Sequence, residues 1–289
     1  MTVIKAALQL ARPANLVTAV ADILAGIAIA GLTTGWGNAA WLIVSTLGLY
    51  GGGVVLNDVF DARLDAEERP ERPIPSGRIS LQLAAILGSA LLLIGVFAAM
   101  IYGYTSGWIA IAIALATIVY NRFAKHSRLF GPLVMGSCRG GNLLLGISAV
   151  PAQLSDWWPV AFVPLVYIAA ITLISQDEVH GGKRFFLYLA WIFYLLVHVS
   201  QLILAVDQGN TWVALILIAV HAWLVGKPLL TAIRNPVGPL IGKAVKAGVI
   251  SLIIMDAAWC MAFGAYELGI VTLLLLPLSI KLGKLFAVT

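Results

Sequence analysis

Long hydrophobic stretches separated by short polar turns fill almost the whole chain. A helix needs about 20 apolar residues to cross the roughly 30 Å hydrocarbon core of a bilayer. Such stretches recur along the sequence and predict ten membrane-spanning helices. Their approximate ranges are 14–34, 39–57, 81–103, 106–121, 130–150, 157–176, 185–206, 211–230, 244–264 and 266–284. The region 244–284 could instead hold one span and an interfacial helix, so nine or ten spans are expected.

Composition agrees with a chain that is surrounded by lipid. Hydrophobic residues make up 61% of the chain and charged residues only 11%, whereas a soluble domain is about half apolar and about a quarter charged. The excess apolar surface must therefore face lipid. No low-complexity tail or Ser/Gly-rich linker interrupts the sequence, which predicts one all-α integral membrane domain over residues 1–289.

Positive charge is distributed unevenly between the two sides of the predicted bundle. Of the 18 Lys and Arg residues, 17 lie on the side of the N-terminus, before the first span or near the ends of the even-numbered spans, and the exception is Arg139. Basic loops stay in the cytoplasm, which places both termini there and favours a bacterial inner membrane. The long polar loops lie on the same side, so we expect the chemistry there as well.

An acidic motif follows the second span. If the helix continues, Asn57, Asp61 and Asp65 recur every four residues and share one face, with Asp58 beside them. Clustered carboxylates resist ionisation without a counter-charge. Oxygen ligands without His or thiolate favour Mg²⁺, which prefers one or two carboxylates together with substrate phosphates. The motif therefore predicts a magnesium site for a phosphorylated, lipid-like substrate.

The next segment, residues 67–78, contains three prolines that exclude a helix interior. Its arginines, Arg69, Arg72 and Arg78, offer planar donors for phosphate oxygens. Two alternatives remain open here. The arginines are topology anchors, or the acidic motif is a solvated helix end whose carboxylates pair with Arg63 and Arg69.

Ionisable residues inside the predicted spans are costly and should face the interior of the bundle with a partner. Arg139 and Asn142, in the fifth span, are expected to line a central cavity. Asp256 is either the partner of Arg139 or part of an acceptor site, unless Arg139 extends to the membrane surface. Three further polar residues are expected to make interhelical hydrogen bonds: Asp22, His198 and Gln201.

These motifs resemble the UbiA superfamily of intramembrane prenyltransferases. The family pattern N-D-x-x-D-x-x-x-D, followed by R-x-x-R-P-[IL]-P-S-G, matches residues 57–77 without a gap. The opening Arg12-Pro13-Ala14-Asn15 resembles the family's R-P-x-N. The resemblance implies a bundle of nine to ten helices around a central cavity. It also implies Mg²⁺-dependent transfer of a prenyl group from a polyprenyl diphosphate to a lipophilic, often aromatic, acceptor.

The resemblance also implies roles for individual residues. Metal binding is expected from Asn57, Asp58, Asp61, Asp65, Asp177 and Glu178, and Asn57, Asp61, Asp65 and Asp177 are the expected catalytic residues. Substrate binding is expected from Arg12, Asn15, Arg69, Arg72, Tyr120, Lys125, Arg128, Arg139 and Asn142. In this scheme Mg²⁺ and basic groups neutralise the departing diphosphate, and the bundle shelters the carbocation from water.

The second acidic motif, at residues 175–184, departs from the family pattern D-x-x-x-D. Asp177 takes the first acidic position, but Gly181 stands where the second carboxylate belongs. Glu178 would point about 100° away on a helix. The second metal site is therefore incomplete, or it combines Asp177 with Glu178 or His180. This segment resembles a divergent branch of the family that is labelled EboC-like.

Three functions are compatible with these features. The first is the prenyltransferase that the resemblance implies, with membrane lipid rather than nucleic acid around it. The altered second motif favours a terpene cyclase as the second. The buried Arg139 and Asp256 favour a carrier or lipid-binding protein as the third. Transporters commonly contain repeated broken helices, and the sequence has no such repeat.

Overall fold

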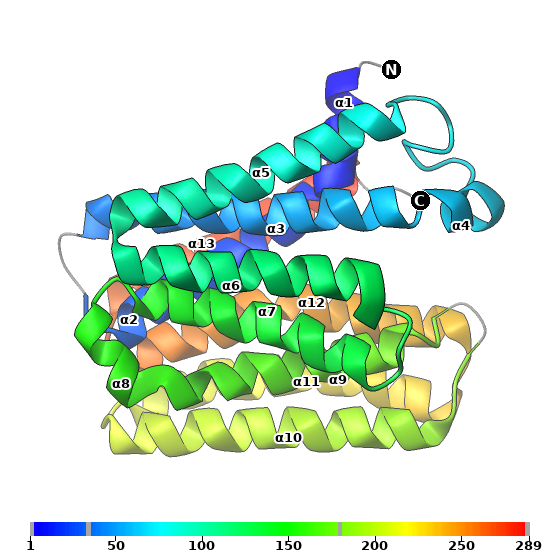
Figure 1. The fold of residues 1–289 in the computed structure, drawn as a ribbon. Coiled ribbons are helices and arrows are strands. Elements are labelled where there is room, and N and C mark those ends of the chain that lie inside the picture. Colours follow the sequence, from blue (N-terminus) through cyan, green and yellow to red (C-terminus); the bar gives the residue numbers. More distant parts are fainter. Residues whose placement is uncertain (1–2, 33–35, 179–180, 287–289) are drawn as a thin grey trace.

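The computed structural model describes residues 3–32, 36–178 and 181–286, which form helices and turns and contain no strand. The long helices of this part run along one another as a bundle (Figure 1). They are α2 (Pro13–Ile29), α3 (Ala40–Phe60), α5 (Leu81–Tyr102), α6 (Tyr104–Val119), α7 (Phe130–Ile147), α9 (Phe162–Ser175), α10 (Arg184–Asp207), α11 (Thr211–Arg234), α12 (Gly238–Ala262) and α13 (Tyr266–Phe286).

Each predicted span coincides with one of these helices. By length and composition, eight described helices can cross a membrane, or nine if α2 is counted together with α1 (Val3–Ala11), from which it is bent by 45°. The remaining long helix, α7, carries Arg139 and packs against α2, α6 and α9. The region 244–284 forms parts of two helices, α12 and α13, that are each long and apolar enough to cross a membrane.

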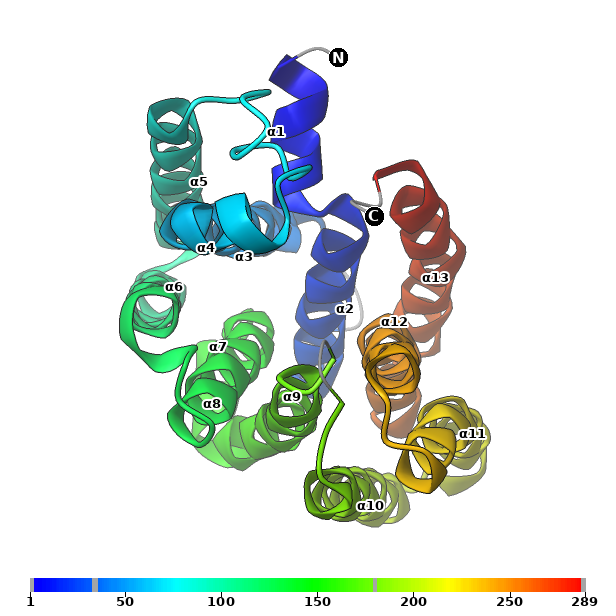
Figure 2. The ribbon, with the colours of Figure 1, turned by 90° about the vertical axis from the view of Figure 1, so that its right-hand side faces the viewer.

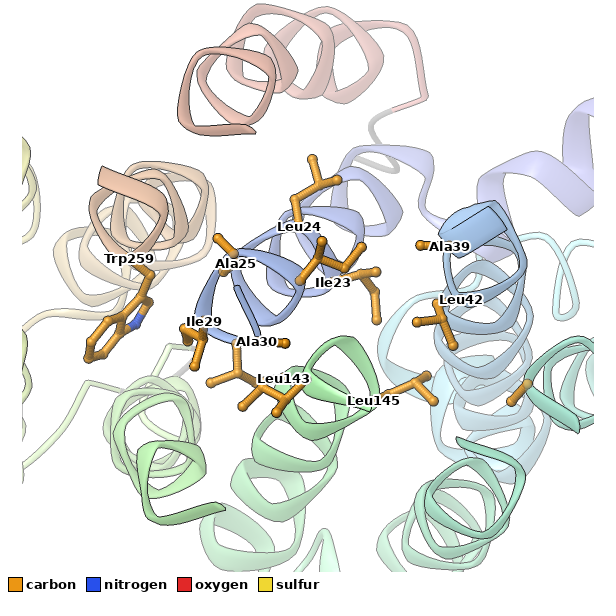
Figure 3. Close-up of a cluster of buried hydrophobic side chains, with 14 of the residues drawn as sticks. Ile23, Leu24, Ala25, Ile29, Ala30, Ala39, Leu42, Leu143, Leu145 and Trp259 are labelled. Carbon is orange, nitrogen blue, oxygen red and sulfur yellow. The ribbon is translucent and has the colours of Figure 1, made fainter. Parts of the chain in front are cut away.

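Helix α2 lies in the middle of the bundle (Figure 2) and contacts α3, α7, α12 and α13. Its apolar residues form a core with residues of these neighbours, such as Ile23 with Leu143 and Trp259 (Figure 3). The backbones of α2 and α7 touch, because a Cβ atom at Gly26 would lie 2.5 Å from the carbonyl oxygen of Leu143. Small residues permit such close helix packing in membranes.

Polar groups inside the bundle connect the helices, as the sequence predicts. The Nε2 atom of His198 lies 2.8 Å from Nδ1 of His221 on α11. Gln201 donates a hydrogen bond of 3.0 Å to the carbonyl oxygen of Met255 on α12. In contrast, large apolar side chains such as Leu195 on α10 are exposed on the outer surface, where they can face lipid.

The long loops gather at one end of the bundle. This end contains α1, the short helix α4 (Ala62–Glu68) and the end of α13 (Figure 1). The connections at the opposite end include the single turns 36–39, 151–153 and 158–161 and the short helix α8 (Leu154–Trp157). Both predicted motif loops, 57–80 and 175–184, therefore lie at the same end as far as they are described.

Candidate active site

Two amide side chains connect the end of α3 to the end of α6. The side-chain amide nitrogen of Asn57 donates a hydrogen bond of 3.0 Å to the side-chain oxygen of Asn121. The side-chain nitrogen of Asn121 in turn donates one of 3.0 Å to the carbonyl oxygen of Gly53. Asn121 is only 2% exposed and lies in a π-helical turn, Tyr120–Ala124, that widens the end of α6. Such turns are frequent at functional sites. The sequence analysis missed Asn121, although an amide beside Tyr120 at the end of an apolar span was a signal for it.

The acidic residues keep a helical repeat across the junction between α3 and α4. The backbone N–H of Asp61 donates a hydrogen bond of 3.0 Å to the backbone carbonyl oxygen of Asn57. The backbone N–H of Asp65 donates one of 2.8 Å to the backbone carbonyl oxygen of Asp61. Asn57, Asp61 and Asp65 therefore follow one helical face, although Asp61 itself separates the two helices.

Basic side chains form ion pairs with these carboxylates. Lys125, which follows the π-helical turn, donates a hydrogen bond to Asp61. Arg72 lies 2.7 Å from Oδ2 of Asp65 and 3.5 Å from Oδ1 of Asp58, so it bridges the two. In the described part of the chain, Arg63 and Arg69 make none of these ion pairs. The pairing predicted for a solvated helix end is therefore replaced by pairs with more distant residues.

Arg12 reaches the same cluster from the break between α1 and α2. Its Nη2 atom lies 2.8 Å from Oδ1 of Asp58. Its backbone is left-handed, with φ 47° and ψ 67°, a conformation that costs a non-glycine residue about 1–2 kcal/mol. Pro13 follows and disfavours the ordinary helical region at Arg12. The bend between the helices directs this guanidinium into the site, and strained residues of this kind cluster at functional sites.

The second motif presents Asp177, which is 8% exposed. Its Oδ2 atom accepts a hydrogen bond of 2.8 Å from Arg128, whose guanidinium lies 3.7 Å from the centre of the Phe186 ring. A Cβ atom at Gly182 would lie 2.1 Å from the same oxygen, so only glycine leaves room for the carboxylate. Asp177 and Arg128 thus form a supported pair.

Glu178 connects the second motif to the first. Burial raises the pKa of Glu178 above its ordinary value, and the positive charge of Arg69 partly opposes this effect. The two motif loops therefore face each other closely enough for their charges to interact. His180, the other candidate for the second metal site, lies outside the described residues.

A cavity of about 300 Å³ extends from this cluster into the bundle. Its mouth is polar and is lined by Arg12, Asn15, Asn57, Tyr120 and Asn121. Most of its walls are apolar and come from α3, α6, α9 and α12, and include Leu49, Ile113, Ile171 and Leu252. Away from the mouth it is lined by Thr46, Arg139 and Asn142.

Arg139 does not extend to the membrane surface. It is 5% exposed, and its Nε atom lies 2.6 Å from Oδ2 of Asp22 on α2. Asp256 lies beside this pair. The direct partner of Arg139 is therefore Asp22 rather than Asp256.

A second hollow, of about 530 Å³, lies between the start of α2, the acidic loop and the end of α13. Its lining includes Arg12 and Asn15 at the start of α2 and four charged residues of the acidic loop: Asp58, Arg69, Glu71 and Arg72. Arg12 and Asn15 line both spaces, so they stand at the boundary between this hollow and the cavity in the bundle.

The donor set of the site suits Mg²⁺. The available ligands are carboxylate and amide oxygens, and within the described residues no three Asp, Glu, His or Cys side chains approach closely enough to hold an ion by themselves. Mg²⁺ is commonly bound by one or two carboxylates, water and substrate phosphates rather than by a protein cage. Residues on both motif loops can supply this number of ligands.

Similar proteins were found by sequence. The model of the UbiA prenyltransferase family matches residues 19–240. The digeranylgeranylglyceryl phosphate synthase of Metallosphaera sedula is 33% identical over 130 residues, which are 45% of this chain and 45% of that protein. The synthase of the same name from Methanothrix thermoacetophila is 32% identical over 182 residues, which are 61% of this chain and 68% of that protein. The chain thus aligns with about half to two thirds of the length of these relatives.

Two solved structures have a similar fold. One, described as a digeranylgeranylglyceryl phosphate synthase in membranes, has a TM-score of 0.68 and 22% identity, and the match covers 92% of this chain and 100% of that chain. The other, the apo structure of a UbiA homolog from Aeropyrum pernix K1, also has a TM-score of 0.68, with 14% identity and coverage of 84% and 96%. With the family match and the acidic motif at the mouth of the cavity, these findings lead to one conclusion: the chain belongs to the UbiA prenyltransferase family.

Proposed function

We propose that this protein transfers a prenyl group from a polyprenyl diphosphate to a lipophilic acceptor within the membrane, with Mg²⁺ bound to the diphosphate. One observation carries the proposal. The polar mouth of a largely apolar cavity contains Arg12, which pairs with Asp58, and Asn57 of the first motif. Further carboxylates of both motifs pair with basic side chains at the same end of the bundle. This combination fits a ligand with a charged head and a hydrocarbon tail.

Each charged residue has a role in this proposal. Asn57, Asp61 and Asp65 at the first motif, and Asp177 with Glu178 at the second, would hold Mg²⁺, which would supply positive charge beside the diphosphate. Lys125, Arg72 and Arg128 now pair with carboxylates and can turn to the phosphate oxygens when the donor binds. Arg12 and Asn15 complete the polar mouth from the side of α2.

The reaction exchanges one bond at the allylic carbon. The bond from this carbon to the diphosphate oxygen breaks, because the basic side chains stabilise the negative charge that develops on the leaving oxygen. The acceptor then forms a bond to the same carbon and loses a proton. The apolar walls exclude water from the carbocation, and Tyr120 at the mouth helps to close the space.

The names of the relatives suggest where to look for substrates. They are synthases of digeranylgeranylglyceryl phosphate. Their name supports a geranylgeranyl donor, and it favours a membrane lipid over an aromatic ring as the acceptor. The basic end of the bundle, with both motif loops, is proposed to face the cytoplasm.

The test uses the full chain in lipid nanodiscs with labelled geranylgeranyl diphosphate. We expect diphosphate release that requires Mg²⁺ and stops with EDTA, together with a prenylated lipid in the mass spectrum. The variant Asp61→Asn should lower the release rate by about a hundredfold or more, as removal of a transition-state contact does. Asp207→Asn, an exposed residue at the end of α10 far from the motif loops, is the matched control.

Other outcomes would support other functions. Glycine at position 181 still favours the terpene cyclase as the second candidate, and a cyclic product formed without acceptor would support it. If the protein neither binds nor converts any prenyl diphosphate, the proposed function is wrong. Transport of an uncharged solute that survives Asp61→Asn would then indicate a carrier.

A further inference from the structure

The far part of the cavity is polar, although it lies deep inside the bundle. We call Thr46, Arg139 and Asn142, which line this part, the cavity floor. Thr46 precedes Asn57 on α3 by eleven residues, and a rise of about 1.5 Å per residue places it roughly 16 Å below the acidic motif. The diphosphate binds at the mouth in the proposed function, so the floor needs a different explanation.

The side chains of Asn142 and Thr46 can still accept hydrogen bonds but have no hydrogen left to donate. Asn142 donates both of its amide hydrogens, to the carbonyl oxygen of Ala19 at 2.9 Å and to Oδ2 of Asp22 at 2.8 Å. Thr46 donates its hydroxyl hydrogen to the amide oxygen of Asn142 at 2.7 Å. The hydrogens are thus used, and the remaining lone pairs on the oxygens of Thr46 and Asn142 can only accept.

Arg139, in contrast, can still donate hydrogen bonds. Its two terminal nitrogens donate to the carbonyl oxygen of Thr18 at 2.6 Å and to the hydroxyl of Thr18 at 3.3 Å, while Nε faces Asp22. A guanidinium has five N–H groups. Among the described residues, one N–H on each terminal nitrogen therefore has no partner. The floor offers donors and acceptors side by side, which is the complement of a hydroxyl group.

The charges around the floor argue against an anionic ligand. Asp22 and Asp256 are 0% and 1% exposed and lie beside the single guanidinium of Arg139. Oδ1 of Asp22 and Oδ2 of Asp256 accept no hydrogen bond within the described part of the chain. With Asp22 ionised next to Arg139, the cluster has no net positive charge. A further anion at this depth would lack a counter-charge and would be costly.

We propose that the cavity floor recognises an uncharged oxygen of the acceptor, best a hydroxyl, with Asp22 and Asp256 as positioning residues that hold Arg139. The inference rests on the proposed function and names the acceptor chemistry at its site. The hydroxyl accepts a hydrogen bond from Arg139 and donates one to Thr46 or Asn142. It can belong to a hydroxylated ring or to the glycerol part of an ether lipid.

Binding to the full chain in nanodiscs, loaded with Mg²⁺ and geranylgeranyl thiodiphosphate, tests this inference. Mg²⁺-dependent binding of that donor analogue is measured first, and its absence would reject the proposed function itself. Two matched pairs of probes follow. The ring pair is 4-hydroxybenzyl alcohol and 4-hydroxybenzoate, and the ether pair is 2-(hexadecyloxy)ethanol and (hexadecyloxy)acetate. In at least one pair, the uncharged probe should bind about tenfold more tightly than the anion.

Variants connect this preference to the floor. Thr46→Val keeps the shape and removes the hydroxyl, and should weaken the uncharged probe about tenfold, as loss of one or two hydrogen bonds does. Donor binding should change less than twofold. Thr231→Val, on the exposed face of α11, is the matched control. Asp22→Asn removes one of the two carboxyl groups beside Arg139, makes the cluster less negative, and should shift the preference toward the anionic probe, an effect that a purely structural role does not produce.

Three results would overturn the inference. The first is binding of the anionic probe at least as tight as that of the uncharged probe in both pairs. The second is failure of every uncharged probe to bind while the donor analogue binds. The third is equal behaviour of Thr46→Val and Thr231→Val. Thr46→Val and the probe pairs decide the question even if Asp22→Asn does not fold.

Discussion

Ion pairs at the mouth of the cavity balance charges at the boundary of the membrane. Lys125 holds Asp61, and Arg128 holds Asp177. Unpaired charges near lipid are costly, and each such pair removes a part of that cost. The same cations can bind phosphate oxygens when metal takes over the carboxylates. Binding of donor and binding of Mg²⁺ should therefore each strengthen the other.

Gly182 provides a test of the Asp177–Arg128 pair. A methyl group at this position would lie 2.1 Å from Oδ2 of Asp177, so Gly182→Ala must displace the carboxylate from Arg128. We expect the KM for the prenyl diphosphate to rise about tenfold, since a charge-assisted hydrogen bond is worth about 1.5–3 kcal/mol. Steady-state diphosphate release measures this change.

The control for this substitution is Gly103→Ala. Gly103 has extended backbone and only one neighbouring atom, at 4.0 Å, so a methyl group fits without displacement. An unchanged KM in both variants would show that the second motif does not hold the donor through Asp177.

At the level of elements, the hydrophobic pattern predicted the positions of the long helices well. In lipid the backbone polar groups must be paired within the protein, and a helix pairs them within one segment. The length and hydropathy of each segment therefore predict where such helices lie. The break between α3 and α4 was not predicted, although the helical repeat continues through it. The repeat that groups Asn57 with Asp61 and Asp65 therefore remained a valid guide to the site.

Other features of the site depend on contacts between distant segments. The side chain of Arg12 donates a hydrogen bond to Asp58, which lies 46 residues further along the chain. The role of Asn121 depends on the approach of α6 to Gly53 on α3. The sequence left Asp256 open as the partner of Arg139, and Asp22 from another helix lies closer to it. The hydrophobic periodicity of a single segment does not predict these contacts between distant segments.

Close packing of α2 on α7 positions both ends of the cavity, because α2 carries Asn15 and begins directly after Arg12, and α7 carries Arg139. Gly26→Ala would place a methyl group 2.5 Å from the carbonyl oxygen of Leu143, and backbone cannot move away easily. We expect the free energy of unfolding to fall by about 1–3 kcal/mol, as overpacking does. A lower thermal midpoint of the purified protein measures this change.

Gly242→Ala on α12 is the comparison, since nothing lies within 4 Å of a methyl group there. Alanine favours a helix over glycine by about 1 kcal/mol, so this variant should be at least as stable as the parent. If Gly26→Ala matches it, the tight contact between α2 and α7 is not a constraint on the fold.

On the scale of the whole molecule, the two ends of the bundle differ in charge, loop length and chemistry. The described parts of the motif loops and helix α1 share one end (Figure 1), and Arg72, Lys125 and Arg128 belong to loops at that end. A donor with a diphosphate head is water-soluble at one end and lipophilic at the other, so it enters best where a polar mouth meets lipid. Basic residues at that mouth also attract anionic head groups. Orientation in the membrane therefore decides which compartment supplies the donor.

Site-directed labelling tests this orientation. Cys138→Ala and Cys260→Ala give a background without thiols. Glu67→Cys then marks α4 at the motif end, and Asp156→Cys marks α8 at the opposite end, and both positions are exposed. A maleimide that does not cross membranes should label position 156 in intact bacterial cells but label position 67 only after permeabilisation. The positive-inside rule predicts this result, because short loops rich in Lys and Arg are retained in the cytoplasm. Labelling of position 67 in intact cells would place the diphosphate site outside the cell, where no cytoplasmic donor reaches it, and the proposed supply of substrate would then be wrong.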